Sequence, residues 1–128
     1  MEKLFAPWRM EYIKQCDDKR GGCIFCDKPR EPDLRGNLVV HCDDAVLVML
    51  NRFPYNSGHL MVIPRTHAAS LGAIPEAEFG ALFTMVRRAT DVLREVYRPE
   101  GFNIGMNLGR SAGAGIDQHL HVHVVPRW

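Results

Sequence analysis

The sequence of 128 residues lacks several features that would assign it to a broad class of protein. It has no apolar run near the roughly 20 residues that a membrane-spanning helix needs, and its first residues lack the apolar core of a secretory signal. Its net charge of +1 shows no excess of one sign, which argues against a nucleic acid polymer as partner. We therefore expect a cytoplasmic protein that makes no contact with membrane, and binding of a small anion at a local site stays open.

Four cysteines are present, and in a chain without an export signal disulfides are the less expected use for them. Cys23 and Cys26 form a Cys-x-x-Cys pair, a spacing typical of metal or redox sites. Cys16 and Cys42 have no partner at a recognisable spacing and are predicted to be ordinary free cysteines. No repeat or linker divides the chain, so we expect a single domain over residues 1–128.

The hydrophobic pattern predicts strands, then one long helix, then further strands. A short helix could form over residues 8–13, and the charged, proline-containing stretch 27–36 predicts a loop. The predicted strands span 38–40, 45–50, 59–64, 102–108 and 118–126. Asp43 and Asp44 would turn the first two strands into a hairpin, and Pro64 would end the third strand or place it at an edge. This order predicts an α+β fold, an antiparallel sheet of about five strands with one long helix packed on one face.

The predicted helix covers residues 75–98. Pro75 suits its first position and Pro99 closes it. Apolar residues recur along the helix at intervals of three and four and form one stripe. The stripe consists of Phe79, Leu82, Phe83, Val86, Ala89, Leu93 and Val96.

The last predicted strand carries three histidines at strict alternation, His119, His121 and His123. Alternate side chains of a strand share a face, so the three rings would line one face about 6.5–7 Å apart, with apolar neighbours on the other. Burying three titratable rings costs free energy unless each has a partner, so a merely solvated or core strand is the less expected alternative. A metal site and covalent catalysis by a neutral imidazole both fit, and the spacing does not separate them.

A glycine-rich stretch at residues 109–115 lies just before the histidines. Glycines let backbone N–H groups approach phosphate oxygens closely, although a plain tight turn has the same composition. Gly113 and Gly115 are the candidates for such contacts. Asn107 and Gln118 flank the stretch and could hydrogen-bond phosphate, or could serve as a strand-end cap and a polar edge residue.

The segment His-Leu-His-Val-His-Val-Val at residues 119–125 resembles the HxHxHxx signature of the histidine-triad (HIT) family. The resemblance covers nearly the whole chain. It extends to Asn51 with Gly58-His59, to Pro64-Arg65-Thr66-His67, to the block 107–115 and to Cys23-Ile24-Phe25-Cys26. The opening residues 8–13 and the closing residues 112–128 look like the branch that contains diadenosine tetraphosphate phosphorylases and hydrolases.

This resemblance implies a nucleotide hydrolase or phosphorylase. His121 would attack the α-phosphorus and form a covalent nucleotidyl-histidine, which water, phosphate or another acceptor then resolves. His123 would stabilise the developing charge or assist the leaving oxygen, and His119 would lie farther back to orient the site or bind metal. The implied substrate is a dinucleoside polyphosphate such as diadenosine tetraphosphate, or a nucleoside phosphoramidate.

The resemblance also implies nucleotide contacts. Asn51 matches the position that holds the ribose hydroxyls, and His59 matches a recurrent family histidine near the site. A turn residue and a buried, hydrogen-bonded histidine are the structural alternatives. Phe25 and Leu50 could flank the base or belong to the core. Residues 116–118 replace a serine that many small members carry, which weakens transfer of a phosphoramidase preference to this chain. Family members are usually homodimers.

A structural zinc ion is implied as well. Some bacterial relatives, and the related galactose-1-phosphate uridylyltransferases, bind zinc at positions that match Cys23, Cys26, His67 and His119. Two sulfurs and two nitrogens form a closed tetrahedral site, whereas packed cysteines and hydrogen-bonded histidines are the alternative. Two other function classes stay open: a nucleotide-binding sensor or interaction module with little turnover, and a zinc-storage or metal-sensing protein.

Overall fold

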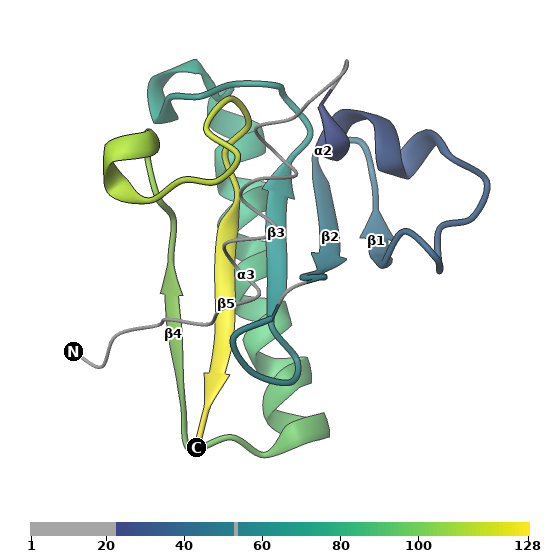
Figure 1. The fold of residues 1–128 in the computed structure, drawn as a ribbon, viewed down its shortest axis with the longest axis vertical. Coiled ribbons are helices and arrows are strands. Elements are labelled where there is room, and N and C mark those ends of the chain that lie inside the picture. The colour runs from purple at the N-terminus through teal and green to yellow at the C-terminus, as the bar shows by residue number, and fades with distance from the viewer. Residues whose placement is uncertain (1–22, 53) are drawn as a thin grey trace.

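A computed structural model describes residues 23–52 and 54–128. In this part of the chain five strands form one antiparallel sheet in the order β1-β2-β3-β5-β4 (Figure 1). The strands are β1 (Val39–Cys42), β2 (Val46–Leu50), β3 (Leu60–Pro64), β4 (Gly101–Gly105) and β5 (Val122–Arg127). The helices are α2 (Ile24–Asp27), α3 (Glu76–Tyr97) and the short 3₁₀ segments η1 (Lys28–Arg30), η2 (Leu71–Ala73) and η3 (Arg110–Ala112). The predicted short helix at 8–13 and Cys16 lie outside the described residues.

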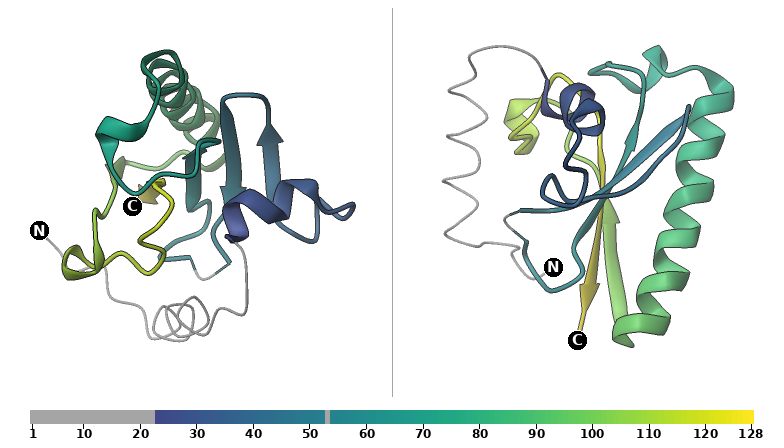
Figure 2. Two further views of the ribbon diagram at one scale, coloured as in Figure 1. Left: turned by 90° about the horizontal axis from the view of Figure 1, so that it is seen from above. Right: turned by 90° about the vertical axis from the view of Figure 1, so that its right-hand side faces the viewer.

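The long helix α3 covers one face of the sheet, while α2 and the loop around η3 lie on the other (Figure 2). This confirms the predicted α+β architecture. Strand alternation sends one set of apolar side chains toward α3 and the other set away from it. The cluster against α3 contains Val46, Val48, Leu60, Val62, Leu82, Val86, Ala89, Leu93, Val122 and Val124. No helix among the described residues has the length and apolar character needed to cross a membrane.

The buried stripe of α3 is narrower than the sequence pattern predicts. Four of its apolar residues are buried, namely Leu82, Val86, Ala89 and Leu93. Phe79, Phe83 and Val96 are instead 36%, 42% and 66% exposed. Helical periodicity identifies an apolar face, but the width of the buried arc depends on how much of that face the sheet touches.

The end of α3 stores a small amount of backbone strain. Arg98 caps the helix in the left-handed region, with φ of 51°, and its N–H bonds to the carbonyl of Arg94. Residues other than glycine adopt this left-handed backbone conformation at a cost of roughly 1–2 kcal/mol. Glycine is the residue that helix ends usually place there.

Substitution of Arg98 by glycine is therefore expected to stabilise the fold by about 0.5–1 kcal/mol, because relief of strain outweighs the added freedom of the unfolded chain. Urea unfolding of both proteins would measure the difference. Arg87→Gly, in the interior of the same helix, should destabilise by about 1 kcal/mol and serves as the control. An Arg98→Gly protein less stable than the parent would contradict this account of the cap.

The hairpin between β1 and β2 turns at Asp43, as predicted. Its Oδ1 accepts hydrogen bonds from the N–H groups of Ala45 and Val46, each at 2.8 Å. Its Oδ2 lies 2.8 Å from Nε2 of His41. The hydrogen bond from His41, followed by those from the two backbone amides, lowers the pKa of Asp43 to about 2. His41 thus has a partner within the turn, away from the other histidines.

The face of the sheet opposite α3 supports the histidines. A second apolar cluster there joins Phe25 of α2 to Leu47, Met49, Met61, Ile63 and Ile116. Pro64 ends β3, which lies between β2 and β5, so the alternative of an edge strand is wrong. The last strand is shorter than predicted, because β5 begins at Val122 rather than at residue 118. Before it, the N–H of Leu120 bonds to the carbonyl of Ala68 at 2.8 Å, which draws this stretch away from the sheet ladder.

Candidate functional site

Three polar residues, Asn51, His59 and His123, lie within neighbouring strands of the sheet or just beyond their ends. Asn51 follows β2, His59 precedes β3, and the backbone N–H of Asn51 bonds to the carbonyl of His59 at 3.0 Å. His123 pairs with Met61 of β3 on one side and with Gly105 of β4 on the other. Asn51, His59 and His123 therefore lie in sequence across the sheet, from the end of β2 to the edge strand β4.

His121 is held in one orientation by its own neighbourhood. Its ring nitrogen Nδ1 lies 3.0 Å from the carbonyl oxygen of His119, and since a carbonyl only accepts, Nδ1 must donate. A neutral ring then carries its lone pair on Nε2. The side chain is 6% exposed and packs on Phe25, with ring centroids 5.0 Å apart, and on His123, with centroids 4.9 Å apart.

A chain of hydrogen bonds sets the tautomer of a neutral His123. The backbone N–H of Tyr55 donates to Nδ1 of His59 at 3.2 Å, so in a neutral His59 the proton lies on Nε2. Nε2 of His59 lies 2.8 Å from Nδ1 of His123 and donates to it. A neutral His123 then carries its own proton on Nε2. The two adjacent rings therefore present different groups at Nε2, a lone pair in His121 and an N–H in His123.

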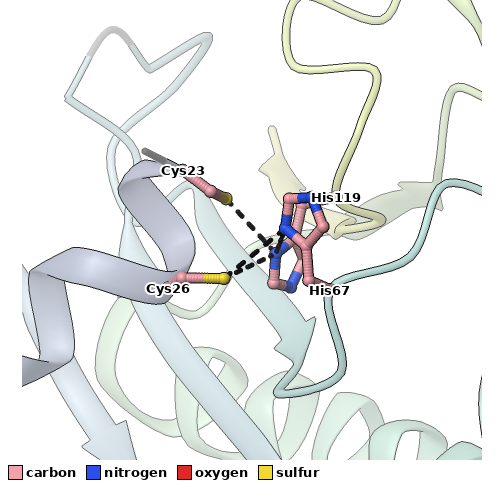
Figure 3. A group of neighbouring side chains, drawn as sticks. All are labelled: Cys23, Cys26, His67 and His119. Atoms are coloured by element: carbon pink, nitrogen blue, oxygen red, sulfur yellow. Dashed lines mark hydrogen bonds between the residues drawn. The ribbon is translucent and has the colours of Figure 1, made fainter. Parts of the chain in front are cut away.

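His119 faces a different group of residues. Its Nδ1 lies 3.3 Å from Sγ of Cys23, 3.6 Å from Sγ of Cys26 and 3.2 Å from Nδ1 of His67. Sγ of Cys26 is also 3.5 Å from Nδ1 of His67. Figure 3 shows Cys23, just before α2, and Cys26, within α2, pointing toward the two rings. The four donor atoms lie within 4.8 Å of one another.

This group fits a tetrahedral zinc ion. Ligands about 2.0–2.3 Å from zinc at tetrahedral corners lie about 3.3–3.8 Å from one another, close to the separations found here. Nε2 of His119 donates to the carbonyl of Pro64 at 2.7 Å, which leaves the Nδ1 lone pair directed at the cysteines. Within the described residues the group includes a single triad histidine, which favours a structural ion over metal storage along the whole histidine segment.

Burial shapes the chemistry of these ligands. Burial lowers the pKa of His119, and the hydrogen bond to the Pro64 carbonyl partly opposes this shift. The ring is therefore neutral near neutral pH, as a ligand must be. Burial, and then the neighbouring Cys23, raises the pKa of the Cys26 thiol. A divalent cation offsets the cost of bringing two thiolates together.

The glycine-rich stretch forms a tight loop around η3. Gly109 and Gly113 have φ of 83° and 92°, a region that glycine adopts without strain. Nδ2 of Asn107 reaches the carbonyl of Gly113 at 3.4 Å, so Asn107 is tied to the loop. Gly115 is half-buried, whereas Gln118 is exposed. The structure thus places Asn107, Gly113 and Gly115 in one loop.

Comparison with known proteins places the chain in a family. A model described as the HIT domain matches residues 35–128. The chain belongs to the HIT-domain family. A relative named AP-4-A phosphorylase, from Mycobacterium tuberculosis, is 40% identical over 135 aligned residues that cover 100% of this chain and 69% of the relative. The prediction of an enzyme, a HIT-family nucleotide hydrolase or phosphorylase, is confirmed at this level.

Solved HIT structures share the fold. A HIT family protein from Bacillus anthracis superposes with a TM-score of 0.71 at 28% identity, covering 86% of this chain and 76% of that protein. A zinc-bound histidine triad protein from Mycobacterium smegmatis superposes with a TM-score of 0.68 at 30% identity, covering 84% and 76% of the two chains.

One contributor to the site of this HIT domain was not predicted from the sequence. Tyr55 fixes His59 through its backbone N–H, and its ring stacks on His59 with centroids 5.4 Å apart and planes 17° apart. A backbone donor leaves no trace in the side-chain pattern. Of the two residues expected to flank the base, Phe25 is buried in the core against His121, while Leu50 is partly exposed.

Proposed function

We propose that this HIT protein transfers a nucleotidyl unit from the α-phosphorus of its substrate to His121 and then to an acceptor. The observation that carries the proposal is the hydrogen bond from Nδ1 of His121 to the carbonyl of His119, which directs a lone pair onto Nε2 beside His123. A neutral imidazole prepared in this way is a nucleophile near neutral pH.

Two displacements complete the reaction. In the first, Nε2 of His121 bonds to the α-phosphorus, the bond from phosphorus to the leaving group breaks, and Nε2–H of His123 donates a hydrogen bond that stabilises the negative charge developing on the leaving atom. In the second, water or phosphate bonds to the same phosphorus, the bond to His121 breaks, and the proton of an attacking water passes to solvent. His59 keeps the His123 ring in place through both steps.

The substrate proposed is a dinucleoside polyphosphate such as diadenosine tetraphosphate, or a nucleoside phosphoramidate. The name of the Mycobacterium tuberculosis relative supports the first. Asn51 would hold the ribose, and the loop with Asn107, Gly113 and Gly115 would bind the phosphates. Gln118 would contact phosphate only at the exposed rim of that loop.

Covalent trapping tests the proposal against a nucleotide-binding module with little turnover. Acid quench during turnover of a substrate labelled with ³²P at the α-phosphorus should leave label on the parent protein and none on His121→Asn. His41→Asn, which alters a histidine near the end of β1, should label normally. Absence of label from the parent at every pH and substrate tried would favour the binding module. Products formed with and without inorganic phosphate then identify the acceptor, because phosphorolysis yields a nucleoside diphosphate and hydrolysis a monophosphate.

Cys23, Cys26, His67 and His119 would hold a structural zinc ion. The donor set and the lone-pair direction at His119 support this, together with the zinc-bound Mycobacterium smegmatis neighbour. Bound there, zinc supplies a cross-link between α2, the segment after β3 and the segment before β5. The same backbone segment carries the carbonyl that orients His121.

Replacement of His59 by alanine is expected to lower kcat about tenfold for substrates with a poor leaving group, because His123 loses the hydrogen bond that His59 donates to it and therefore its fixed tautomer. Substrates whose leaving group departs readily should lose much less. His41→Ala removes a histidine that contacts Asp43 at the β1–β2 hairpin, and it should change neither rate. Equal losses for both kinds of substrate in His59→Ala would show that His59 does not act on the leaving group.

A homodimer is proposed from the apolar surface that α3 and β4 leave exposed. Phe79 and Phe83 form an exposed aromatic pair with centroids 5.3 Å apart. Ile104 of the edge strand β4 is 47% exposed. Such a surface is typical of association with a second copy.

Light scattering should then give twice the chain mass of 14.5 kDa. Phe83→Lys is expected to weaken the dimer at least about tenfold, because a charge would enter its apolar contact. Val40→Lys on β1, the opposite edge of the sheet, is the matched control. A single-chain mass at high protein concentration would contradict the proposal.

A further inference from the structure

The stretch between β3 and α3 supplies one of the proposed zinc ligands, His67. Residues 65–69 of this stretch lie in no helix or strand, and His67 is exposed. His119, by contrast, is buried and donates from Nε2 to the carbonyl of Pro64. The backbone around His67 must therefore be held by other contacts if its ring is to stay at a ligand position.

Glu78, in the first turn of α3, supplies such contacts. Its Oε1 accepts a hydrogen bond from the backbone N–H of Thr66 at 2.7 Å, and its Oε2 accepts one from Oγ1 of the same residue at 2.6 Å. Hydrogen bonds to a carboxylate are about twice as strong as those between neutral groups. Both residues are partly buried, which limits competition from water. The pair thus fixes the chain directly before His67.

The start of α3 explains why the carboxylate of Glu78 is available to Thr66. A glutamate at the third position of a helix often reaches back to the backbone N–H of the residue that caps the helix. In α3 the cap is Pro75, which has no N–H to donate. The side chain of Glu78 therefore reaches across to the stretch after β3 instead.

The far end of the same stretch is linked to the segment that leads into β5. The carbonyl of Ala68 accepts the N–H of Leu120 at 2.8 Å, and both residues belong to one small apolar cluster. Between these fixed ends, Nδ1 of His67 lies 3.2 Å from Nδ1 of His119 (Figure 3). A shift at the near end would therefore move His67 away from His119 and loosen the segment that carries the acceptor for His121.

We propose that Glu78 is a positioning residue for the metal centre, because through Thr66 it holds His67 at ligand distance from a zinc ion. With the ion in place, the segment between His119 and His121 keeps its orientation. The inference rests on the proposed zinc site and, for the orientation of His121, on the proposed nucleotidyl transfer. Glu78 touches neither metal nor substrate in this role.

The affinity for zinc tests this role, and competition with a chromophoric chelator measures its Kd in the purified protein. Glu78→Ala is expected to raise the Kd at least about tenfold, the usual effect of losing a group that positions a metal ligand. Glu78→Gln should stay within about threefold of the parent, because its amide oxygen accepts from the N–H of Thr66 and its amide N–H donates to Oγ1. Glu76→Ala removes an exposed charge from the same turn and should leave the Kd unchanged.

Thermal unfolding separates positioning from a general contribution to stability. Loss of two hydrogen bonds lowers the Tm of Glu78→Ala even without metal, but positioning predicts that its deficit relative to the parent widens when zinc is supplied. A deficit that is the same with and without zinc, together with an unchanged Kd, would overturn the proposal. If Glu78→Ala does not fold, Thr66→Val, which removes only the bond from Oγ1, carries the same comparison with an expected rise in Kd of about threefold. No rise in Thr66→Val would then overturn it.

Two controls keep the inference apart from the proposals on which it rests. A parent protein that binds no zinc would contradict the metal centre itself, whereas normal binding by the parent with an unchanged Kd in Glu78→Ala contradicts only the role of Glu78. Labelling of His121 from a substrate with ³²P at the α-phosphorus is measured at limiting and at saturating zinc. In Glu78→Ala it should slow at limiting zinc and recover at saturating zinc, and equal rates at both would overturn the link to His121. Absence of label from the parent would contradict nucleotidyl transfer.

Discussion

Cys26→Ser is expected to lose bound zinc and to unfold about 10–20 °C below the parent protein, because a structural ion contributes several kcal/mol to a domain of this size. The four proposed ligands come from three segments that are distant in sequence, so a bound ion would cross-link them. Metal analysis and thermal unfolding of the purified proteins measure the two effects. Cys42→Ser changes an exposed cysteine outside the cluster and should alter neither.

The same substitution should slow turnover at temperatures where the variant is still folded. The side chain of His119 is a proposed ligand, and its carbonyl is the acceptor that orients His121. Release of the ion frees the backbone at this point, so we expect about a tenfold loss of kcat with KM nearly unchanged. A variant that keeps one equivalent of zinc, or that loses it with no change in stability, would contradict the proposed metal centre.

His121→Gly is expected to lower kcat/KM by about 10⁴-fold, because it removes the atom that bonds to phosphorus. Added imidazole should restore part of the rate, since a free ring can occupy the space that the substitution leaves. Steady-state kinetics with and without imidazole measure both effects, and His41→Gly is the control for loss of a histidine elsewhere. Activity of His121→Gly within tenfold of the parent would rule out its role as nucleophile.

The sheet and helix were predictable from sequence because their hydrophobic periods are regular. The ends of these elements and the width of their buried faces were less predictable. Apolar periodicity marks Phe79, Phe83 and Val96 as part of the stripe of α3, but it carries no information on how wide a face the sheet covers. The late start of β5 likewise follows from a contact between Leu120 and Ala68, which are distant in sequence.

The candidate site was likewise predictable only in part. Cys23 and His119 are 96 residues apart, and only their resemblance to a family pattern connected them before the structure did. Which nitrogen carries the proton in neutral His59 and His123 depends on the backbone N–H of Tyr55, and no side-chain motif encodes this contact.

The stereochemical course at phosphorus tests the central claim most directly. A substrate made chiral at the α-phosphorus with sulfur and oxygen isotopes is hydrolysed, and the configuration of the product is determined. Two in-line displacements, through a bond to His121, predict net retention of configuration. Net inversion would show that the acceptor attacks the substrate itself, and it would contradict the covalent nucleotidyl-histidine.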